Sequence, residues 1–547
     1  MKDQIIQQQK HWFKLKSWQL HVLTSLLLLC LYNAAFWMEI NKIVAPSGFA
    51  DYLFMASIFL LLFIIINLII NLLCNRYSYR VLYPIIFIGS ALSLYFIKQY
   101  SIIIDRDMIQ NIVETNPAEA TDFINLTMFF YLFLLALVPL VLIFKSTITF
   151  QSLKQGLLLK FKILALSSIS MVVLLYVSYP SYASMARGNR HLSHLIVPTN
   201  FIFASISYLK QQVKSAHKPL ALISKDAKLD DFWLKPQEKT VLILVIGETA
   251  RADHFGIFGY EKQTTPKLAK RDLVKFNHVS SCGTSTAISL PCMFSHLDRE
   301  NFSKDIAKNS ENLLDFLANS GFSVQWRDNN TGCKGICKRV EFLDLTDVKD
   351  NPHCTTGECF DEILLEDMAQ QIKENPNNQV IVLHQKGSHG PAYYLRYPQS
   401  FNKFTPICAT NELQDCSETE LKNTYDNTIL YTDFVVDKII ALLDGLPAEY
   451  NASLIYLSDH GESLGENNIF LHGTPYFMAP DAQTHVPLML WLSDPFKQNF
   501  GIDQACLKHK QNLDFSHDNF FHSILGLLNI NTQFYDPNKD IFQTCEL

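Results

Sequence analysis

The sequence predicts a helical membrane domain of five spans, followed by a soluble α/β domain built on a mostly parallel sheet. Long apolar runs fill the first third of the 547-residue chain, whereas short apolar runs alternate with helical stretches in its second half. Ten of the twelve cysteines follow residue 280. The chain is too long for one ordinary domain. Its formal net charge of −6, with no basic stripe, gives no support for a nucleic-acid partner.

Five apolar segments near the N-terminus are long enough to cross a bilayer, which takes about 20 apolar residues in a helix. They run from 20 to 39, 52 to 73, 81 to 97, 124 to 144 and 161 to 177. The first is not a cleavable signal peptide, because its apolar stretch is too long and no small-residue cleavage site follows it.

Basic residues predict the orientation of these spans. They precede the first span, separate the second from the third, and separate the fourth from the fifth. These residues are Lys2, Lys10, Lys14 and Lys16, then Arg76 and Arg80, then Lys145, Lys154, Lys160 and Lys162. Because Lys and Arg are retained in cytoplasmic loops, the chain after Tyr179 is expected outside the cytoplasm.

We expect three domains: a transmembrane domain over 1–178, a connector over 179–238 and a soluble catalytic domain over 239–547. The connector is polar and rich in turn residues. Its segment 201–213 is compatible with an amphipathic helix on the membrane surface, or with a plain surface linker.

The soluble domain has the pattern of a doubly wound sheet. The apolar runs 241–247, 380–384 and 453–458 are short, β-branched and bounded by turn residues, as is typical of strands buried on both faces. Helical stretches at 312–320 and 427–443 separate them. Alternating strands and helices predict a parallel sheet covered by helices.

The cysteines after residue 280 predict disulfides. Eight of them form four pairs of close neighbours in sequence, and the remaining two lie near the C-terminus. The expected pairs are Cys282–Cys292, Cys333–Cys337, Cys354–Cys359, Cys408–Cys416 and Cys506–Cys545. Zinc clusters are the alternative, but the spacings do not repeat a C-x-x-C pattern. Disulfides agree with a domain outside the cytoplasm.

Candidate metal ligands follow two predicted strands. Glu248 comes directly after 241–247, and Asp459 and His460 come directly after 453–458. Ligands gather beyond the carboxyl ends of strands in open α/β sheets. Carboxylate and imidazole groups suit a tetrahedral zinc site.

Between these strands lies a candidate nucleophile. Thr284, Ser285 and Thr286 stand at an expected helix start, braced by the predicted Cys282–Cys292 disulfide. Such a hydroxyl is most often a helix N-cap. A hydroxyl bound to zinc can also ionise and attack phosphorus, and a helix N-terminus favours phosphate. The residue pattern does not distinguish among the three hydroxyls.

Two further groups fit a phosphate. His389 and His472, like His460, each adjoin a glycine in a predicted loop. The segment 328–335 carries amide and ammonium donors on a disulfide-braced loop, which suit a phosphate or a carboxylate. A solvated turn is the alternative for this segment.

Four motifs show a resemblance to a known family: IGETARADHFGIFGY, SCGTSTAISLPCMFS, GSHGPAYYLRYP and SDHGESLGENNIFLHG. Together with five spans and a disulfide-rich domain, they resemble the lipid A phosphoethanolamine transferases, a group that includes the mobile colistin-resistance enzymes. The resemblance implies an alkaline phosphatase/sulfatase-like fold for the catalytic domain.

The resemblance also implies roles for individual residues. Thr286, the second Thr of C-G-T-x-T, matches the nucleophile, and it shares a zinc ion with Glu248, Asp459 and His460. His389 and His472 match ligands of a second metal or of the substrate phosphate. The implied substrate-binding residues are Asn330, Lys334, Asn111, Thr115 and Glu119.

The implied reaction transfers phosphoethanolamine from phosphatidylethanolamine to a lipid A phosphate through a covalent intermediate on Thr286. The expected protein is a zinc-dependent monomer in the bacterial inner membrane, with its catalytic domain in the periplasm. Less negative surface charge would then give polymyxin resistance.

Other functions are weighed against this one. Phosphoglycerol or phosphoethanolamine transfer to another envelope glycan, such as core oligosaccharide, is the nearest alternative, although phosphoglycerol enzymes lack these cysteines and usually use manganese. A sulfatase fits less well, because the formylglycine signature is missing around Cys282. A non-catalytic lipid receptor is an alternative of another class.

Overall fold

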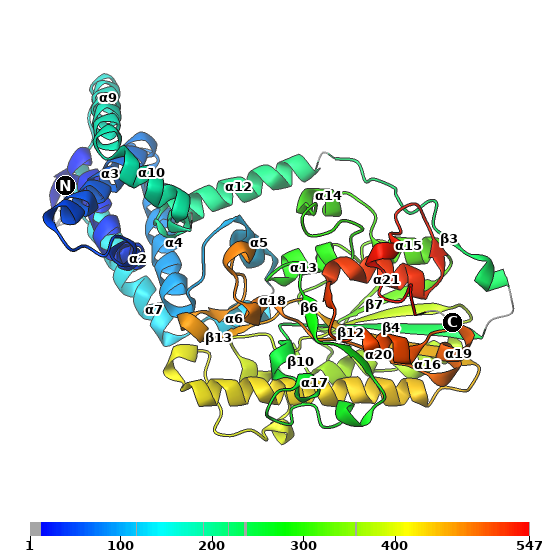
Figure 1. Cartoon of the computed structure of the whole chain (residues 1–547). Helices are drawn as coiled ribbons and strands as arrows, with labels where there is room; N and C mark the ends of the chain where they lie inside the picture. The colour runs from blue at the N-terminus through cyan, green and yellow to red at the C-terminus, as the bar shows by residue number, and fades with distance from the viewer. Residues whose placement is uncertain are drawn as a thin grey trace, which may run out of the picture. The chain divides into compact units, whose positions relative to one another are not determined.

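The structure, a computed structural model, describes residues 13–545 apart from 116, 190, 217, 235–237 and 356–357. Lys2 and Lys10 lie outside the described residues. The chain forms two compact units (Figure 1). One comprises Met1–Ile109 and Ile124–Tyr208, and the other comprises Gln110–Phe123 and Leu209–Leu547. The domain limits expected at 178 and 238 stay predictions.

The first unit is helical and has the apolar lengths that a membrane requires. Among the described residues, four segments are long and apolar enough to span a bilayer: α3 (Phe49–Leu73), α4 (Tyr79–Tyr100), the α7–α8 segment (Leu126–Phe144) and Lys154–Val177 of α9 (Leu153–Val177). None of the described side chains of α9 is buried within the unit, as expected of a helix that faces lipid.

The first predicted span is a bent pair of helices. The segment Ser17–Tyr32, which contains α1 (Ser17–Leu27), meets α2 (Ala34–Val44) at an angle of 64°. Asn33 stands at the break, where its side chain donates to the Leu28 carbonyl at 2.9 Å and accepts from the Val197 amide at 2.9 Å. The first bond satisfies a carbonyl of the helix that ends at the bend, and the second ties the bend to a distant segment. Counted as one span, the pair completes the five expected.

The second unit is built on a seven-stranded, mostly parallel sheet. Its strand order is β5–β15–β12–β4–β11–β7–β8, and only the β12–β15 and β15–β5 pairs are antiparallel. The strands are β4 (Lys239–Gly247), β5 (Val274–Phe276), β7 (Ser323–Asp328), β8 (Glu341–Asp344), β11 (Gln379–His384), β12 (Tyr450–Ser458) and β15 (Leu488–Leu492). The three predicted strands, β4, β11 and β12, are neighbours at its centre.

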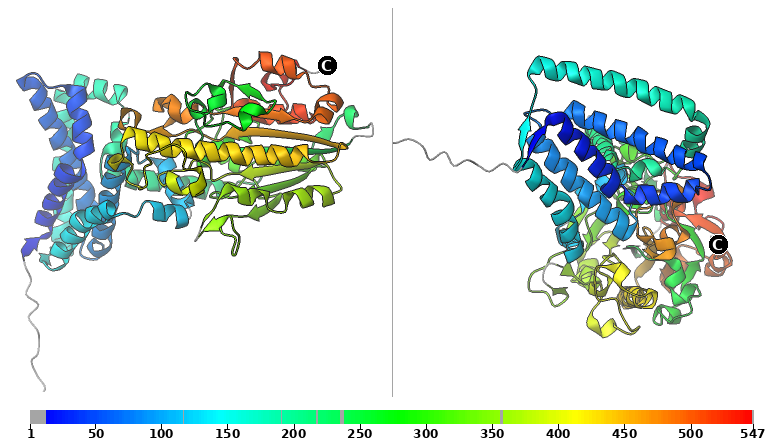
Figure 2. Two further views of the ribbon diagram at one scale, coloured as in Figure 1. Left: turned by 90° about the horizontal axis from the view of Figure 1, so that it is seen from below. Right: turned by 90° about the vertical axis from the view of Figure 1, so that its left-hand side faces the viewer.

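Helices cover both faces of this sheet, which explains the continuous apolar runs of its central strands. Figures 1 and 2 show α17 (Glu418–Asp444) along one face. On the other face lie α13 (Thr286–Met293), α15 (Leu313–Asn319) and α21 (Phe520–Leu527), which share an apolar core with the strands. The sheet therefore buries apolar side chains on both sides.

The strand register places the candidate ligands together. Gly247, the last residue of β4, pairs with Ser458, the last residue of β12. Glu248 and Asp459 follow directly and so leave the same edge of the sheet. In β11 and β7, His384 pairs with Asp328 at this edge as well.

Helix α17 begins nine residues before the predicted Asn427. Ser417 is its N-cap, and Ser417 and Glu420 form a capping box. Its first half buries polar side chains, Thr424 and Asp426 among them, so the apolar periodicity starts late. Helix α15 agrees with its prediction.

The ten cysteines of the second unit form five disulfides, and these are the pairs that the spacing predicts. They are Cys282–Cys292, Cys333–Cys337, Cys354–Cys359, Cys408–Cys416 and Cys506–Cys545. No cysteine among them is available as a thiolate zinc ligand, which excludes the zinc-cluster alternative.

Candidate active site

Four predicted side chains meet beyond the carboxyl edge of the sheet. Glu248 follows β4, Asp459 and His460 follow β12, and Thr286 begins α13. Thr286 Oγ1 donates to Glu248 Oε2 at 3.0 Å and lies 3.4 Å from His460 Nε2. The ligand atoms of Glu248, Asp459 and His460 all lie within 4.8 Å of one another. These residues, brought together from distant parts of the chain, are buried.

Only one of the three candidate hydroxyls faces this cluster. Thr284 Oγ1 donates away from it, to the Thr474 carbonyl at 2.6 Å. Ser285 is the N-cap of α13, and its hydroxyl has no hydrogen-bond partner among the described residues. Thr286 Oγ1 is the hydroxyl that reaches Glu248. The geometry thus distinguishes residues that the local sequence left equivalent.

The cluster leaves ligand atoms free for a metal ion. Glu248 Oε1 and Asp459 Oδ2 are buried and have no hydrogen-bond partner in the described part of the chain. His460 Nε2 lies 3.6 Å from the first and 3.4 Å from the second. His460 Nδ1 is 2.9 Å from the Gly461 carbonyl, so Nδ1 carries the hydrogen and Nε2 presents its lone pair. These three atoms and Thr286 Oγ1 fit a tetrahedral cation such as zinc.

The electrostatics of the cluster favour a bound cation. Burial raises the pKa of the Glu248 carboxyl well above its usual value, and the nearby Asp459 charge raises it further. Burial raises the pKa of Asp459 to about 6. Burial lowers the pKa of His460, and the charge on His472 lowers it further. Two carboxylates in such a site are costly without a positive charge between them.

Unusual backbone conformations hold the candidate ligands in place. Thr249 has a positive φ of 52°, which is rare for a β-branched residue. Its amide donates to Asp459 Oδ1 at 3.3 Å, and its carbonyl accepts from Tyr425 at 2.6 Å. Gly387, with φ of 54°, packs so closely that an added Cβ would lie 2.7 Å from the Glu248 carbonyl oxygen. Strain of this kind is typical of functional sites.

A buried hydrogen-bond chain supports Glu248 from behind. Asn330 Nδ2 donates to Glu248 Oε2 at 2.6 Å and lies 3.3 Å from His384 Nε2. His384 Nδ1 lies 2.8 Å from Asp328 Oδ2, which also accepts from Trp326 at 2.7 Å. We predicted Asn330 as a substrate contact, whereas its amide is turned toward Glu248. Asp328 and His384 end β7 and β11, and the sequence analysis assigned neither of them a role of its own.

The two further histidines lie beside the cluster. The ring centroid of His472 is 4.6 Å from that of His460 and 5.4 Å from that of His389. His472 Nδ1 is 2.8 Å from Glu462 Oε2. Burial alone would lower the pKa of His472, but the Glu462 carboxylate raises it to about 9. Glu462, which directly follows the Asp-His-Gly run, is a site residue that the sequence interpretation quoted without a role.

The remaining predicted substrate residues make local contacts. Lys334 has a positive φ of 49°, and its ammonium group donates to the Thr331 hydroxyl at 2.7 Å. Asn111 lies in α5 (Arg106–Glu114), and the Thr115 hydroxyl donates to its carbonyl at 2.7 Å. The side chain of Glu119 lies outside the described part of the chain.

Comparisons with known proteins agree with this architecture. Residues 240–530 match a family model described as sulfatase, and residues 62–213 match one described as phosphoethanolamine transferase EptA/EptB. Phosphoethanolamine transferase EptA of Salmonella typhimurium is 44% identical over 463 residues, which is 84% of each protein.

Two solved structures are also similar. The integral membrane protein lipooligosaccharide phosphoethanolamine transferase A from Neisseria meningitidis has a TM-score of 0.93 and 36% identity, over 98% of this chain and 99% of that one. The C-terminal periplasmic domain of phosphoethanolamine transferase EptC from Campylobacter jejuni has a TM-score of 0.52 and 43% identity, over 59% of this chain and 97% of that one.

Proposed function

We infer the function of this chain from its family, because it belongs to the EptA family of phosphoethanolamine transferases, within the sulfatase-like superfamily. It is a phosphoethanolamine transferase of the inner membrane, with its catalytic domain in the periplasm. We propose that it takes phosphoethanolamine from phosphatidylethanolamine and transfers it to a lipid A phosphate. The five disulfides agree with this oxidising compartment.

One observation supports the proposed mechanism above the others. Thr286 Oγ1 lies 3.0 Å from Glu248 Oε2 and 3.4 Å from His460 Nε2, at the start of a helix. A nucleophile needs both a group that takes its proton and a site where phosphate can bind. Thr286 has the first in Glu248, and it stands at a helix N-terminus that favours the second.

The metal ligands would be Glu248, Thr286, Asp459 and His460. When bound there, zinc would act as a Lewis acid that favours the ionised form of a hydroxyl. Its charge would also compensate the two buried carboxylates. The free oxygens Glu248 Oε1 and Asp459 Oδ2 support this ligand set.

In the first half-reaction the Thr286 oxygen bonds to the phosphorus of phosphatidylethanolamine. Glu248 Oε2 accepts the hydroxyl proton, the bond to the diacylglycerol oxygen breaks, and diacylglycerol leaves with that proton. His389, His472 and Lys334 supply donors for the phosphoryl oxygens, where negative charge develops. Phosphoethanolamine remains on Thr286.

In the second half-reaction an oxygen of the lipid A phosphate bonds to this phosphorus, and the bond to Thr286 breaks. The product carries the ammonium group of ethanolamine. A cell surface modified in this way has less net negative charge, so it binds cationic peptides such as polymyxins more weakly.

The test compares two adjacent hydroxyls. Thr286→Ala should abolish transfer and polymyxin resistance, whereas Ser285→Ala should retain both, because the Ser285 hydroxyl bonds to no described residue. Mass spectrometry of lipid A from cells expressing each variant measures transfer. Mass spectrometry of enzyme trapped with donor alone identifies the adduct on Thr286. Resistance of Thr286→Ala cells equal to that of wild type would refute the mechanism, and a phosphoglycerol adduct would favour the alternative donor.

A further inference from the structure

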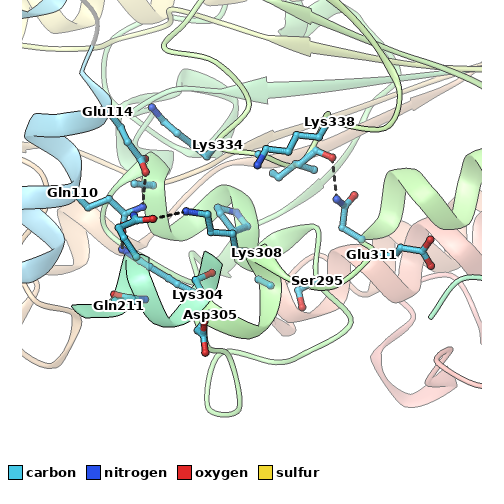
Figure 3. Close-up of a pocket in the computed structure, with 18 residues that line it drawn as sticks. Gln110, Glu114, Gln211, Ser295, Lys304, Asp305, Lys308, Glu311, Lys334 and Lys338 are labelled. Carbon is cyan, nitrogen blue, oxygen red and sulfur yellow. Dashed lines mark hydrogen bonds between the residues drawn. The ribbon is translucent and has the colours of Figure 1, made fainter. Parts of the chain in front are cut away.

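A lysine-lined cavity lies beside α13, within the second unit (Figure 3). Its volume is about 70 Å³. A water molecule needs roughly 10–15 Å³ of such space, so the cavity has room for about five to seven water-sized groups, which is enough for a phosphate. The basic residues that line it are Lys304, Lys308, Lys334 and Lys338. Figure 3 shows Lys334 and Lys338 on one side of it, with Lys304 and Lys308 on the other.

The lysines that line this cavity outnumber its acidic residues. Within the described residues, Lys308 and Lys338 form no ion pair, and Lys308 donates instead to the neutral side chain of Gln212 at 2.7 Å. Two carboxylates of the lining are engaged elsewhere. Asp305 pairs with Lys218, and Glu311 accepts two hydrogen bonds at 2.8 Å from Ser224.

The third carboxylate, Glu114, keeps its negative charge, and its Oε2 atom has no hydrogen-bond partner in the described residues. Glu114 Oε1 accepts from Gln110 Nε2 at 2.8 Å, and the carbonyl oxygen of that same amide accepts from Lys304 at 3.0 Å. Four lysines and three carboxylates line the cavity, and Asp305 is paired with Lys218 outside it, so the lining keeps a net positive charge. The lining suits an anion with several acceptor oxygens.

The cavity is next to the proposed nucleophile. Ala287 and Pro291 line it from α13, and Ala287 directly follows Thr286. Lys334, one of the proposed phosphate donors, also lines it. A phosphate in this cavity would lie against the helix that carries the phosphoethanolamine group.

We propose that this cavity binds the phosphate of the acceptor, an anionic glycolipid, in the second half-reaction. The proposal rests on the function proposed above, and it adds a binding site for the acceptor. The diacylglycerol that leaves in the first half-reaction is neutral and gains nothing from lysines, whereas an acceptor phosphate does. An oxygen of that phosphate forms a bond to phosphorus, the phosphorus–Thr286 bond breaks, and the proton of the monoprotonated acceptor passes to Thr286 Oγ1.

The test removes two lysines that have no assigned role in the first half-reaction. In the double variant Lys308→Gln/Lys338→Gln of the full-length protein, single-turnover release of diacylglycerol from fluorescent phosphatidylethanolamine should equal that of wild type. The KM for purified lipid A should rise about tenfold, as expected for charge-assisted bonds to phosphate. Arginine at both positions should restore the KM. The matched control is Lys270→Gln/Lys403→Gln, two exposed lysines outside the cavity, which should leave it unchanged.

The possible results separate this proposal from the one it rests on. A wild-type KM for lipid A in the double variant overturns the acceptor site and leaves the proposed function intact. An equal loss of diacylglycerol release and of transfer also overturns it, because the lysines would then bind the donor. If wild-type enzyme releases diacylglycerol but does not modify lipid A, the proposed acceptor is wrong, and so is the proposed acceptor site.

Discussion

The contact of Gly387 with the Glu248 backbone gives a sharp test of how the proposed metal ligand Glu248 is held. In Gly387→Ala the new Cβ would lie 2.7 Å from the Glu248 oxygen, whereas ordinary contact begins at 3.4 Å, so the two backbones must separate by about 0.7 Å. Alanine at a φ of 54° also costs roughly 1–2 kcal/mol. Because sites of this kind tolerate about 0.5 Å of displacement, we expect metal affinity to fall by about 10–100-fold.

Gly321→Ala is the matched control. Its φ is 99°, and a Cβ there would meet no atom within 4 Å. It should lose a similar roughly 1–2 kcal/mol of stability, seen as a lower Tm, and keep its metal. Zinc affinity, measured by competition with a chelator, and transferase activity are compared in the two variants. If Gly387→Ala binds zinc within twofold of Gly321→Ala, the contact does not position Glu248.

Three further substitutions test buried polar groups. Asp328→Asn places a donor opposite the His384 ring, so we expect about 3 kcal/mol less stability, and an unchanged Tm would contradict this. Burial lowers the pKa of His517 to about 4. Between pH 6.5 and 4 the His517 ring is protonated in the unfolded chain but not in the folded one. The free energy of unfolding should therefore fall by about 3 kcal/mol as the pH drops from 6.5 to 4. His517→Asn should flatten this pH dependence in melting experiments, and equal slopes would count against the assignment. Arg396→Met leaves the buried partner Asp122 without its cation, so denaturant unfolding should show a loss of about 3–5 kcal/mol, with Arg396→Lys recovering part of it.

The parts of the fold that the sequence predicted are those with a strong local signature. The runs 241–246 and 380–383 are apolar throughout because β4 and β11 are covered on both faces, so their burial is visible in composition alone. The sequence did not predict the start of α17, because buried polar side chains interrupt the apolar pattern there. One of them, Asp426, accepts a hydrogen bond from Lys262 at 2.7 Å. The bend at Asn33 was missed for a related reason, since its partner Val197 is distant in sequence.

The sequence by itself determined the apolar spans, the pairing of neighbouring cysteines and the acidic and histidine residues that end the central strands. Each depends on hydropathy or on spacing along the chain. Only the tertiary structure decided that Thr286, and not Thr284, points at Glu248, and that Lys308 and Lys338 line one cavity. Strand register and helix packing set those contacts, and they depend on residues far apart in the chain, so no local pattern contains them.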